Sequence, residues 1–192
     1  MNDRQLHEAF ARIRRLSAKI GEQSGPGFVD VYLNDDDQMH TYEVLGVKSL
    51  VEFEDELLNA IVWVWSAKDY LKEVAKSCGN DPKDIEKLVN ESKVLMFIAD
   101  LANRSKHGNL RKSRSGKFAK LGQVSMSIPK SAIGTLTVVE SHVSTVIAAP
   151  EEIEYRAPVE SENGEYLADA GECLIEAIKI WEEQGFGFSK GT

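Results

Sequence analysis

Side chains that could do chemistry gather in one short stretch, directly after an apolar run at residues 94–99. They offer a carboxylate, an amide, a guanidinium, an ammonium and an imidazole group: Asp100, Asn103, Arg104, Lys106 and His107. At about 100° per residue, all except Lys106 fall within roughly a third of a helix circumference. An imidazole can move a proton, and a guanidinium or ammonium group can hold a phosphate oxygen. This combination is typical of a site that acts on phosphate esters.

Three roles remain open for this cluster at the level of sequence. In the first, His107 is a general acid and base, while Arg104 or Lys106 binds a phosphate. In the second, Asp100 and Asn103 hydrogen-bond a neighbouring helix and His107 caps the helix end, because buried polar groups are normally paired. In the third, the cluster is a binding surface without chemistry.

The cluster ends a predicted helix over residues 81–107, with Asp81 as its N-cap and Gly108 as its stop signal. A second long helix is predicted over residues 49–77, where apolar side chains recur in a heptad-like line. A short turn joins the two helices, so we expect an antiparallel pair of long helices.

A basic segment follows the cluster, although the chain as a whole carries a net charge of −8. Residues 101–120 contain seven Lys and Arg residues and no acidic residue. This local positive charge predicts contact with a polyanion. The candidate nucleic-acid-binding side chains are Arg111, Lys112, Arg114 and Lys117. Alternatively, the segment is a solvated loop that pairs with the acidic surface of its own chain or of a partner subunit.

The remaining elements complete an α+β fold that is mostly α. The helical core is expected at residues 1–22, 49–107 and 164–184, within a single domain of residues 1–192. Two β excursions are expected, at about residues 28–47 and 118–157. The first should form a hairpin. The second should form an antiparallel hairpin with a third strand near residues 153–156, which gives a small sheet.

Composition argues against several other classes of protein. No apolar run approaches 18 residues, so we expect no membrane-spanning helix and no membrane partner. The charged N-terminus lacks the apolar core of a signal peptide, so a cytoplasmic location is expected. Cys78 and Cys173 stand apart from any zinc-type spacing, so neither a metal nor another cofactor is predicted.

The polar run at the end of the predicted helix over residues 81–107 resembles that of HEPN-like bacterial and phage proteins. Its pattern is D-x-x-N-x-x-K-H, formed by Asp100, Asn103, Lys106 and His107. The closing segment NGEYLADAGECLIEAIKIWEEQ is also similar to the end of such proteins. The resemblance covers about residues 49–110 and 164–184, and it implies a helical bundle with terminal helices around the long pair.

Many HEPN-like proteins are metal-independent RNases of toxin–antitoxin or phage-defence systems, and they usually act as dimers. The resemblance therefore implies RNA as a partner, a homodimer, and RNA cleavage by the 2′-hydroxyl. In that reaction His107 would move the proton and Arg104 or Lys106 would stabilise the phosphorane. Asn103 and Asp100 would orient the histidine.

One departure from the family pattern leaves a second function open. HEPN RNases carry an Arg and a His separated by four to six residues, whereas only two residues separate Arg104 from His107. The chain could therefore bind RNA without cleaving it. It could also be a non-catalytic dimerisation or adaptor module, with partner contacts from the aromatic side chains of residues 49–77 and from a hairpin edge.

Overall fold

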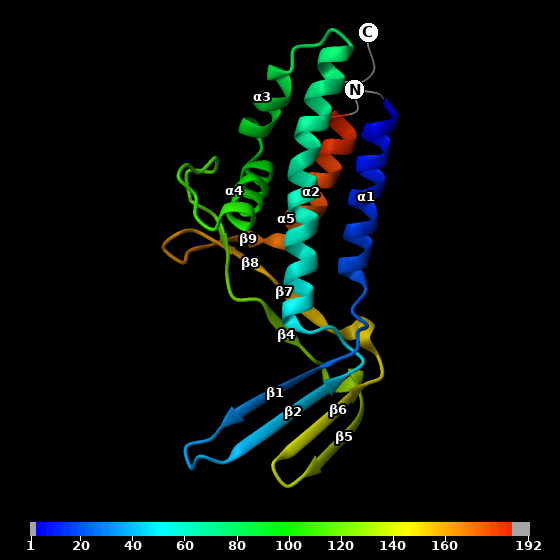
Figure 1. Ribbon diagram of the computed structural model, residues 1–192, viewed down its shortest axis with the longest axis vertical. Coiled ribbons are helices and arrows are strands. Elements are labelled where there is room, and N and C mark those ends of the chain that lie inside the picture. Colours follow the sequence, from blue (N-terminus) through cyan, green and yellow to red (C-terminus); the bar gives the residue numbers. More distant parts are fainter. Residues whose placement is uncertain (1–2, 186–192) are drawn as a thin grey trace. The chain divides into compact units, whose positions relative to one another are not determined.

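The computed structural model describes residues 3–185, and the chain forms two compact units. Unit 1 is drawn from Met1–Lys19, Asp55–Gln123 and Ala157–Thr192. Unit 2 is drawn from Ile20–Glu54 and Val124–Arg156. Helices dominate unit 1 and strands dominate unit 2 (Figure 1), so the predicted α+β class is confirmed.

Unit 1 is built around helices whose apolar faces form its core. The helices are α1 (Asp3–Gly21), α2 (Leu50–Ser77), α3 (Lys83–Glu91), α4 (Lys93–His107) and α5 (Ala170–Ile180), followed by a π-helical turn, Trp181–Gly185. Apolar residues at helical spacing on these elements are almost completely buried, among them Phe10, Leu57, Leu101 and Trp181. Burial of such stripes stabilises the helices, because short isolated helices are marginal in water.

The expected helix over residues 81–107 is divided at Ser92, so the prediction of one long helix was wrong. Ser92 has an extended backbone (φ −105°, ψ 114°), and its Oγ accepts a hydrogen bond from the N–H of Leu95. A serine in this position caps a new helix and ends the old one. The second predicted helix corresponds closely to α2, Leu50–Ser77. The antiparallel pair of long helices is therefore not confirmed.

A strand replaces the first turn of the predicted C-terminal helix. In unit 1, β9 (Tyr166–Asp169) pairs with β8 (Pro158–Glu160), which also pairs with β3 (Lys120–Leu121); all pairs are antiparallel. The helix expected to follow the turn near residue 164 therefore begins at Ala170. Asp169 caps it, because one carboxylate oxygen accepts the N–H groups of Gly171 and Glu172.

Unit 2 contains a four-stranded sheet with the order β1-β2-β6-β5. Its strands are β1 (Phe28–Leu33), β2 (Met39–Leu45), β5 (Ile133–Val139) and β6 (His142–Ile147). An antiparallel hairpin joins β1 to β2, as predicted. Another joins β5 to β6 within residues 133–147, where no turn was predicted, and β2 and β6 run parallel. The strand expected near residues 153–156 exists as β7 (Glu154–Arg156), and it pairs antiparallel with β4 (Ser125–Ser127).

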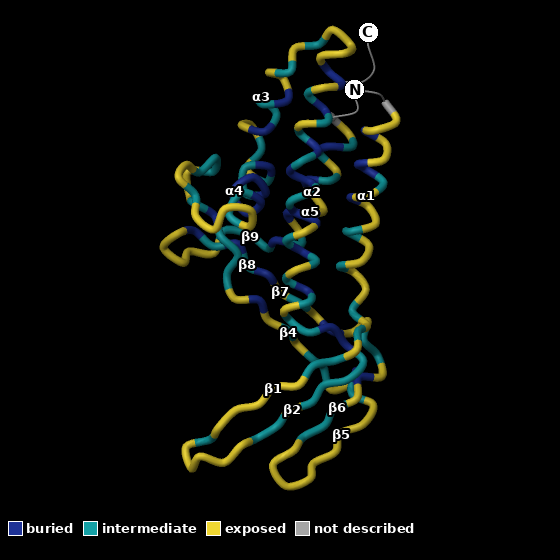
Figure 2. The backbone as a smooth tube through the Cα atoms, viewed as in Figure 1, coloured by how far each residue is buried: buried dark blue, intermediate teal, exposed yellow. Residues whose placement is uncertain are grey.

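The core of unit 2 covers only one end of this sheet. Its buried residues are Val47, Ala132, Ile147 and Ile153, and Phe28 and Val44 pack against them. Because β2 and β6 are parallel, the turns of both hairpins lie together at the opposite end. Toward those turns the strands are exposed or only partly buried (Figure 2).

Candidate nucleic-acid interface

The loop after α4 is organised around the buried carboxylate of Asp100, which is only 1% exposed. Four donors reach its oxygens at 2.6 to 3.3 Å: the hydroxyls of Ser113 and Ser115 and the backbone N–H groups of Arg114 and Ala119. Burial of a charged group is costly unless hydrogen bonds compensate it, and these four donors provide the compensation. Asp100 thus holds the loop, rather than a neighbouring helix or the imidazole of His107.

Arg104 holds the far end of the same loop. Its Nη2 donates to the carbonyl oxygen of Phe118 at 3.2 Å, and its Nε donates to that of Ala119 at 3.4 Å. The side chain is half-buried, and its guanidinium is directed at main-chain carbonyls. Arg104 therefore bonds the loop of its own chain. Lys106 is the remaining phosphate-binding candidate on α4.

Acidic side chains of unit 1 engage two of the predicted nucleic-acid-binding residues. Nη1 of Arg114 lies 2.7 Å from Oε2 of Glu86, and its guanidinium lies 5.2 Å from the ring centroid of Trp65. Nζ of Lys117 lies 3.5 Å from Oε2 of Glu165. For these two residues the structure agrees with the alternative of a basic loop paired with the acidic surface of its own chain. We therefore leave both out of the interface.

Glu86 anchors this pairing from α3. Burial of its carboxyl would by itself raise the pKa, but hydrogen bonds from Lys72 and Arg114 outweigh that effect and hold the pKa below its ordinary value. Glu86 consequently stays charged at neutral pH and keeps Arg114 turned toward the helices. The rest of the loop is then free to present its other cations.

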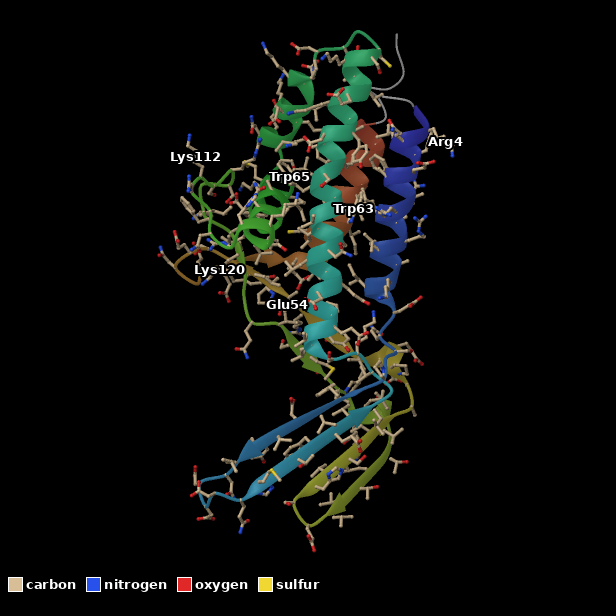
Figure 3. The ribbon with its side chains drawn as sticks, in the orientation of Figure 1. Arg4, Glu54, Trp63, Trp65, Lys112 and Lys120 are labelled. Carbon is tan, nitrogen blue, oxygen red and sulfur yellow. The ribbon has the colours of Figure 1, made fainter. Side chains whose placement is uncertain are left out.

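Three exposed cations of the basic segment form no ion pair within the described part of the chain: Lys106, Arg111 and Lys112. Figure 3 labels Lys112 on the loop that follows α4. Arg111 and Lys112 line a pocket of about 410 Å³, together with Asn103, His107, Asn109 and Leu110.

This pocket brings together part of the predicted site and adds two residues that the sequence did not single out. Asn103 and His107 line it with Arg111 and Lys112, whereas the Asp100 carboxylate is buried beneath the loop. Asn109 and Leu110 are additional lining residues. The pocket therefore offers two amides, an imidazole and two cations to one ligand, a set suited to a phosphate ester and its sugar.

A second hollow of about 460 Å³ lies along α1 and α2 and is less suited to an anion. The guanidinium of Arg12 already covers the ring of Trp63, at 4.4 Å from the ring centroid. The carboxylate of Glu8 also lines this hollow. An incoming phosphate would have to displace the cation–π contact and lie close to a negative charge.

Metal sites, membrane spans and relatives provide no further guide to function. Across residues 3–185, no three His, Cys, Asp or Glu side chains are grouped so that they could bind a metal ion. In the same range, no helix combines the length and the apolar character that crossing a membrane requires. Comparisons with protein-family models, with curated proteins and with solved structures find no significant match.

Proposed function

We propose that unit 1 binds single-stranded RNA at the pocket lined by Asn103, His107, Arg111 and Lys112. The observation that carries this proposal is a set of three cations without ion pairs, in a segment whose other cations are engaged. Arg111 and Lys112 line the pocket, and Lys106 precedes His107 on α4. Phosphate neutralisation supplies most of the affinity of such surfaces. The resemblance to HEPN-like proteins supports RNA binding at this pocket. It also suggests that the protein acts in a toxin–antitoxin or phage-defence system.

The distribution of charge between the units supports RNA binding by unit 1. Unit 2 contains twelve acidic residues and three Lys or Arg residues, which gives it a net charge of −9. Because the whole chain has a net charge of −8, unit 1 has a net charge of +1. Unit 2 therefore repels a polyanion more strongly than unit 1 does, and in unit 1 three cations without ion pairs lie at the end of α4 and on the loop after it.

The shape and chemistry of the pocket favour a single strand over a duplex. Its volume of about 410 Å³ suits one nucleotide rather than a double helix. Single-stranded bases can stack on an imidazole or a guanidinium plane, and amide groups can hydrogen-bond the 2′-hydroxyl. Asn103, His107 and Arg111 provide these three kinds of contact.

The same residues could cleave the bound strand. His107 would take the proton from a 2′-hydroxyl, and that oxygen would attack the adjacent phosphorus. The 5′-oxygen would then leave and take a proton from solvent water, which yields a 2′,3′-cyclic phosphate and a 5′-hydroxyl end, and the imidazolium of His107 would return its proton to solvent. Arg111 and Lys112 would stabilise the phosphorane in place of Arg104, because electrostatic stabilisation of developing charge needs donors that face the substrate.

Titration of a fluorescently labelled oligoribonucleotide tests binding. With three cations involved, we expect the logarithm of the association constant to fall with the logarithm of salt concentration with a slope of about −2. The double variant Arg111→Ala/Lys112→Ala should lose about two thirds of that slope. The double variant Lys76→Ala/Lys179→Ala removes the same amount of charge from α2 and α5, and it should keep the slope of the wild type. Absence of binding at low salt, or equal slopes for both variants, would contradict the proposal.

A further inference from the structure

The four-stranded sheet of unit 2 exposes an unusual number of large apolar side chains. Ten of them are between 37% and 66% exposed: Val29, Val31, Tyr32, Leu33, Met39, Tyr42, Leu136, Val138, Val139 and Val146. They lie on both faces of the sheet, on strands that Figure 2 shows as exposed or partly buried. Extended apolar surfaces of this kind mark sites of association in proteins.

The two edge strands of this sheet differ in charge. The β1 edge carries Asp30 and leads into the acidic turn Asp35–Asp37. The β5 edge, Ile133–Val139, has the sequence IGTLTVV, with neither a charged residue nor a proline. Proteins normally protect an exposed edge strand with charges, prolines or bulges. The β1 edge has one charged residue within the strand and an acidic turn after it, whereas β5 has only an irregularity between Ile133 and Thr135.

The register of the β5–β6 hairpin determines which backbone groups of β5 face outward. A two-residue turn joins Val139 to its partner His142, and such a closing pair exchanges hydrogen bonds. Because the pattern alternates, Thr137 also bonds β6, while the N–H and C=O groups of Leu136 and Val138 point to the open edge. The hydrogen bond from the N–H of Thr41 to the carbonyl of Ser141, on the side of β6 that faces β2, agrees with this alternation of backbone groups.

We propose that β5 pairs with β5 of a second copy of this chain, antiparallel about a two-fold axis at Thr137. In this register Leu136 lies opposite Val138 of the partner subunit. The outward N–H and C=O groups of Leu136 bond to those of the partner's Val138, and the same bonds form at the symmetry-related pair. Leu136 and Val138 share one face of the strand, so the four side chains form one apolar cluster across the new ladder. The result is a continuous sheet of eight strands.

A second copy fits this edge better than an anionic partner does. A nucleic acid or an anionic membrane would meet a unit of net charge −9. The antiparallel arrangement sends the acidic turns of the two copies to opposite ends of the joint sheet, beyond the screening length of about 8 Å. The pairing also closes on itself, because a two-fold contact uses the β5 edge of both copies and leaves neither free for a third.

The expected contact area indicates a weak dimer. A seven-residue strand is about 24 Å long, and pairing along it with side-chain contact on both faces buries on the order of 900 Å² in total, at the small end of specific interfaces. We therefore expect a dissociation constant in the micromolar range. This inference does not depend on RNA binding, since no residue of the RNA pocket takes part.

Sedimentation equilibrium from about 1 to 200 μM tests the dimer. Val138→Lys should raise its dissociation constant at least tenfold, because two lysine charges, one from each subunit, cannot be buried in the apolar cluster with Leu136. Val31→Lys on the β1 edge is the matched control, since Val31 is 56% and Val138 63% exposed. It should leave the constant within about twofold. A monomeric wild type at 200 μM, or equal effects of the two variants, would overturn the proposal.

A disulfide test examines the register directly. Thr137 would face Thr137 of the partner subunit in a non-hydrogen-bonded pair, with Cα atoms about 4.5 Å apart, within the range for a disulfide. Thr137→Cys, in a chain that also carries Cys78→Ser, should form a covalent dimer under mild oxidation. Thr135→Cys in the same background should stay mostly uncrosslinked. Failure of Thr137→Cys to crosslink in a protein that dimerises would contradict this interface.

Discussion

Replacing Asp100 with alanine is expected to lower the free energy of unfolding by about 3–4 kcal/mol, since several hydrogen bonds to one buried charge are lost together. Two serine hydroxyls and two backbone N–H groups would lose their acceptor. Each buried donor left without a partner costs about 1–3 kcal/mol, although water that enters the loop would offset part of the total. Chemical denaturation monitored by tryptophan fluorescence measures the change.

The exposed carboxylate of Asp69 provides the control for this substitution. Its side chain is 71% exposed and lies 3.3 Å from Nζ of Lys68. Asp69→Ala should change the free energy of unfolding by less than about 0.5 kcal/mol. An Asp100→Ala variant within 1 kcal/mol of the wild type would contradict the role of Asp100 in holding the loop. The RNA pocket would then have no rigid support.

Replacing His107 with alanine is expected to slow RNA cleavage by a factor of about 10² to 10⁴, the usual contribution of a general acid or base. The affinity for RNA should fall only by the loss of one stacking contact, about 1–3 kcal/mol, because Lys106, Arg111 and Lys112 still supply the charge. Cleavage is measured as the release of products with 2′,3′-cyclic phosphate ends. His142→Ala removes another exposed histidine, from unit 2, and should leave the rate unchanged.

Two outcomes separate the parts of this proposal. If the wild type binds RNA and leaves it intact, the pocket is a binding site without chemistry. If the His107→Ala variant cleaves at the rate of the wild type, another group moves the proton and the assignment of His107 is wrong. Neither outcome affects the salt dependence expected from the three cations.

Local patterns in the sequence predicted the elements that local forces determine. Helical periodicity located α2, and alternation of apolar residues before a short turn located the β1–β2 hairpin. The turn between β5 and β6 was missed, because the Thr- and Val-rich pattern continues across it. The break at Ser92 was missed because the helical spacing of apolar residues continues across it. That spacing gives no sign that Ser92 ends one helix and caps the next. Strand β9 was missed for a different reason: its pairing with β8 overrides the helical pattern of residues 166–169.

The candidate site was predictable in composition but not in detail. The apolar neighbours of Asp100 indicated a buried carboxylate that needs partners. Those partners lie 13 to 19 residues further along the chain, in the loop itself, where no periodicity applies. The partner acids Glu86 and Glu165 are likewise distant in sequence from Arg114 and Lys117. Which cations stay unpaired is therefore decided by tertiary contacts.

NMR can map where RNA contacts the protein. A ¹⁵N-labelled sample is titrated with a short single-stranded oligoribonucleotide at low salt, and the backbone amide shifts are followed residue by residue. We expect the largest changes on the end of α4 and the following loop, from Asn103 to Lys112, with the sheet of unit 2 unaffected. Changes concentrated along α1 and α2 or on unit 2, or no changes at all, would contradict it.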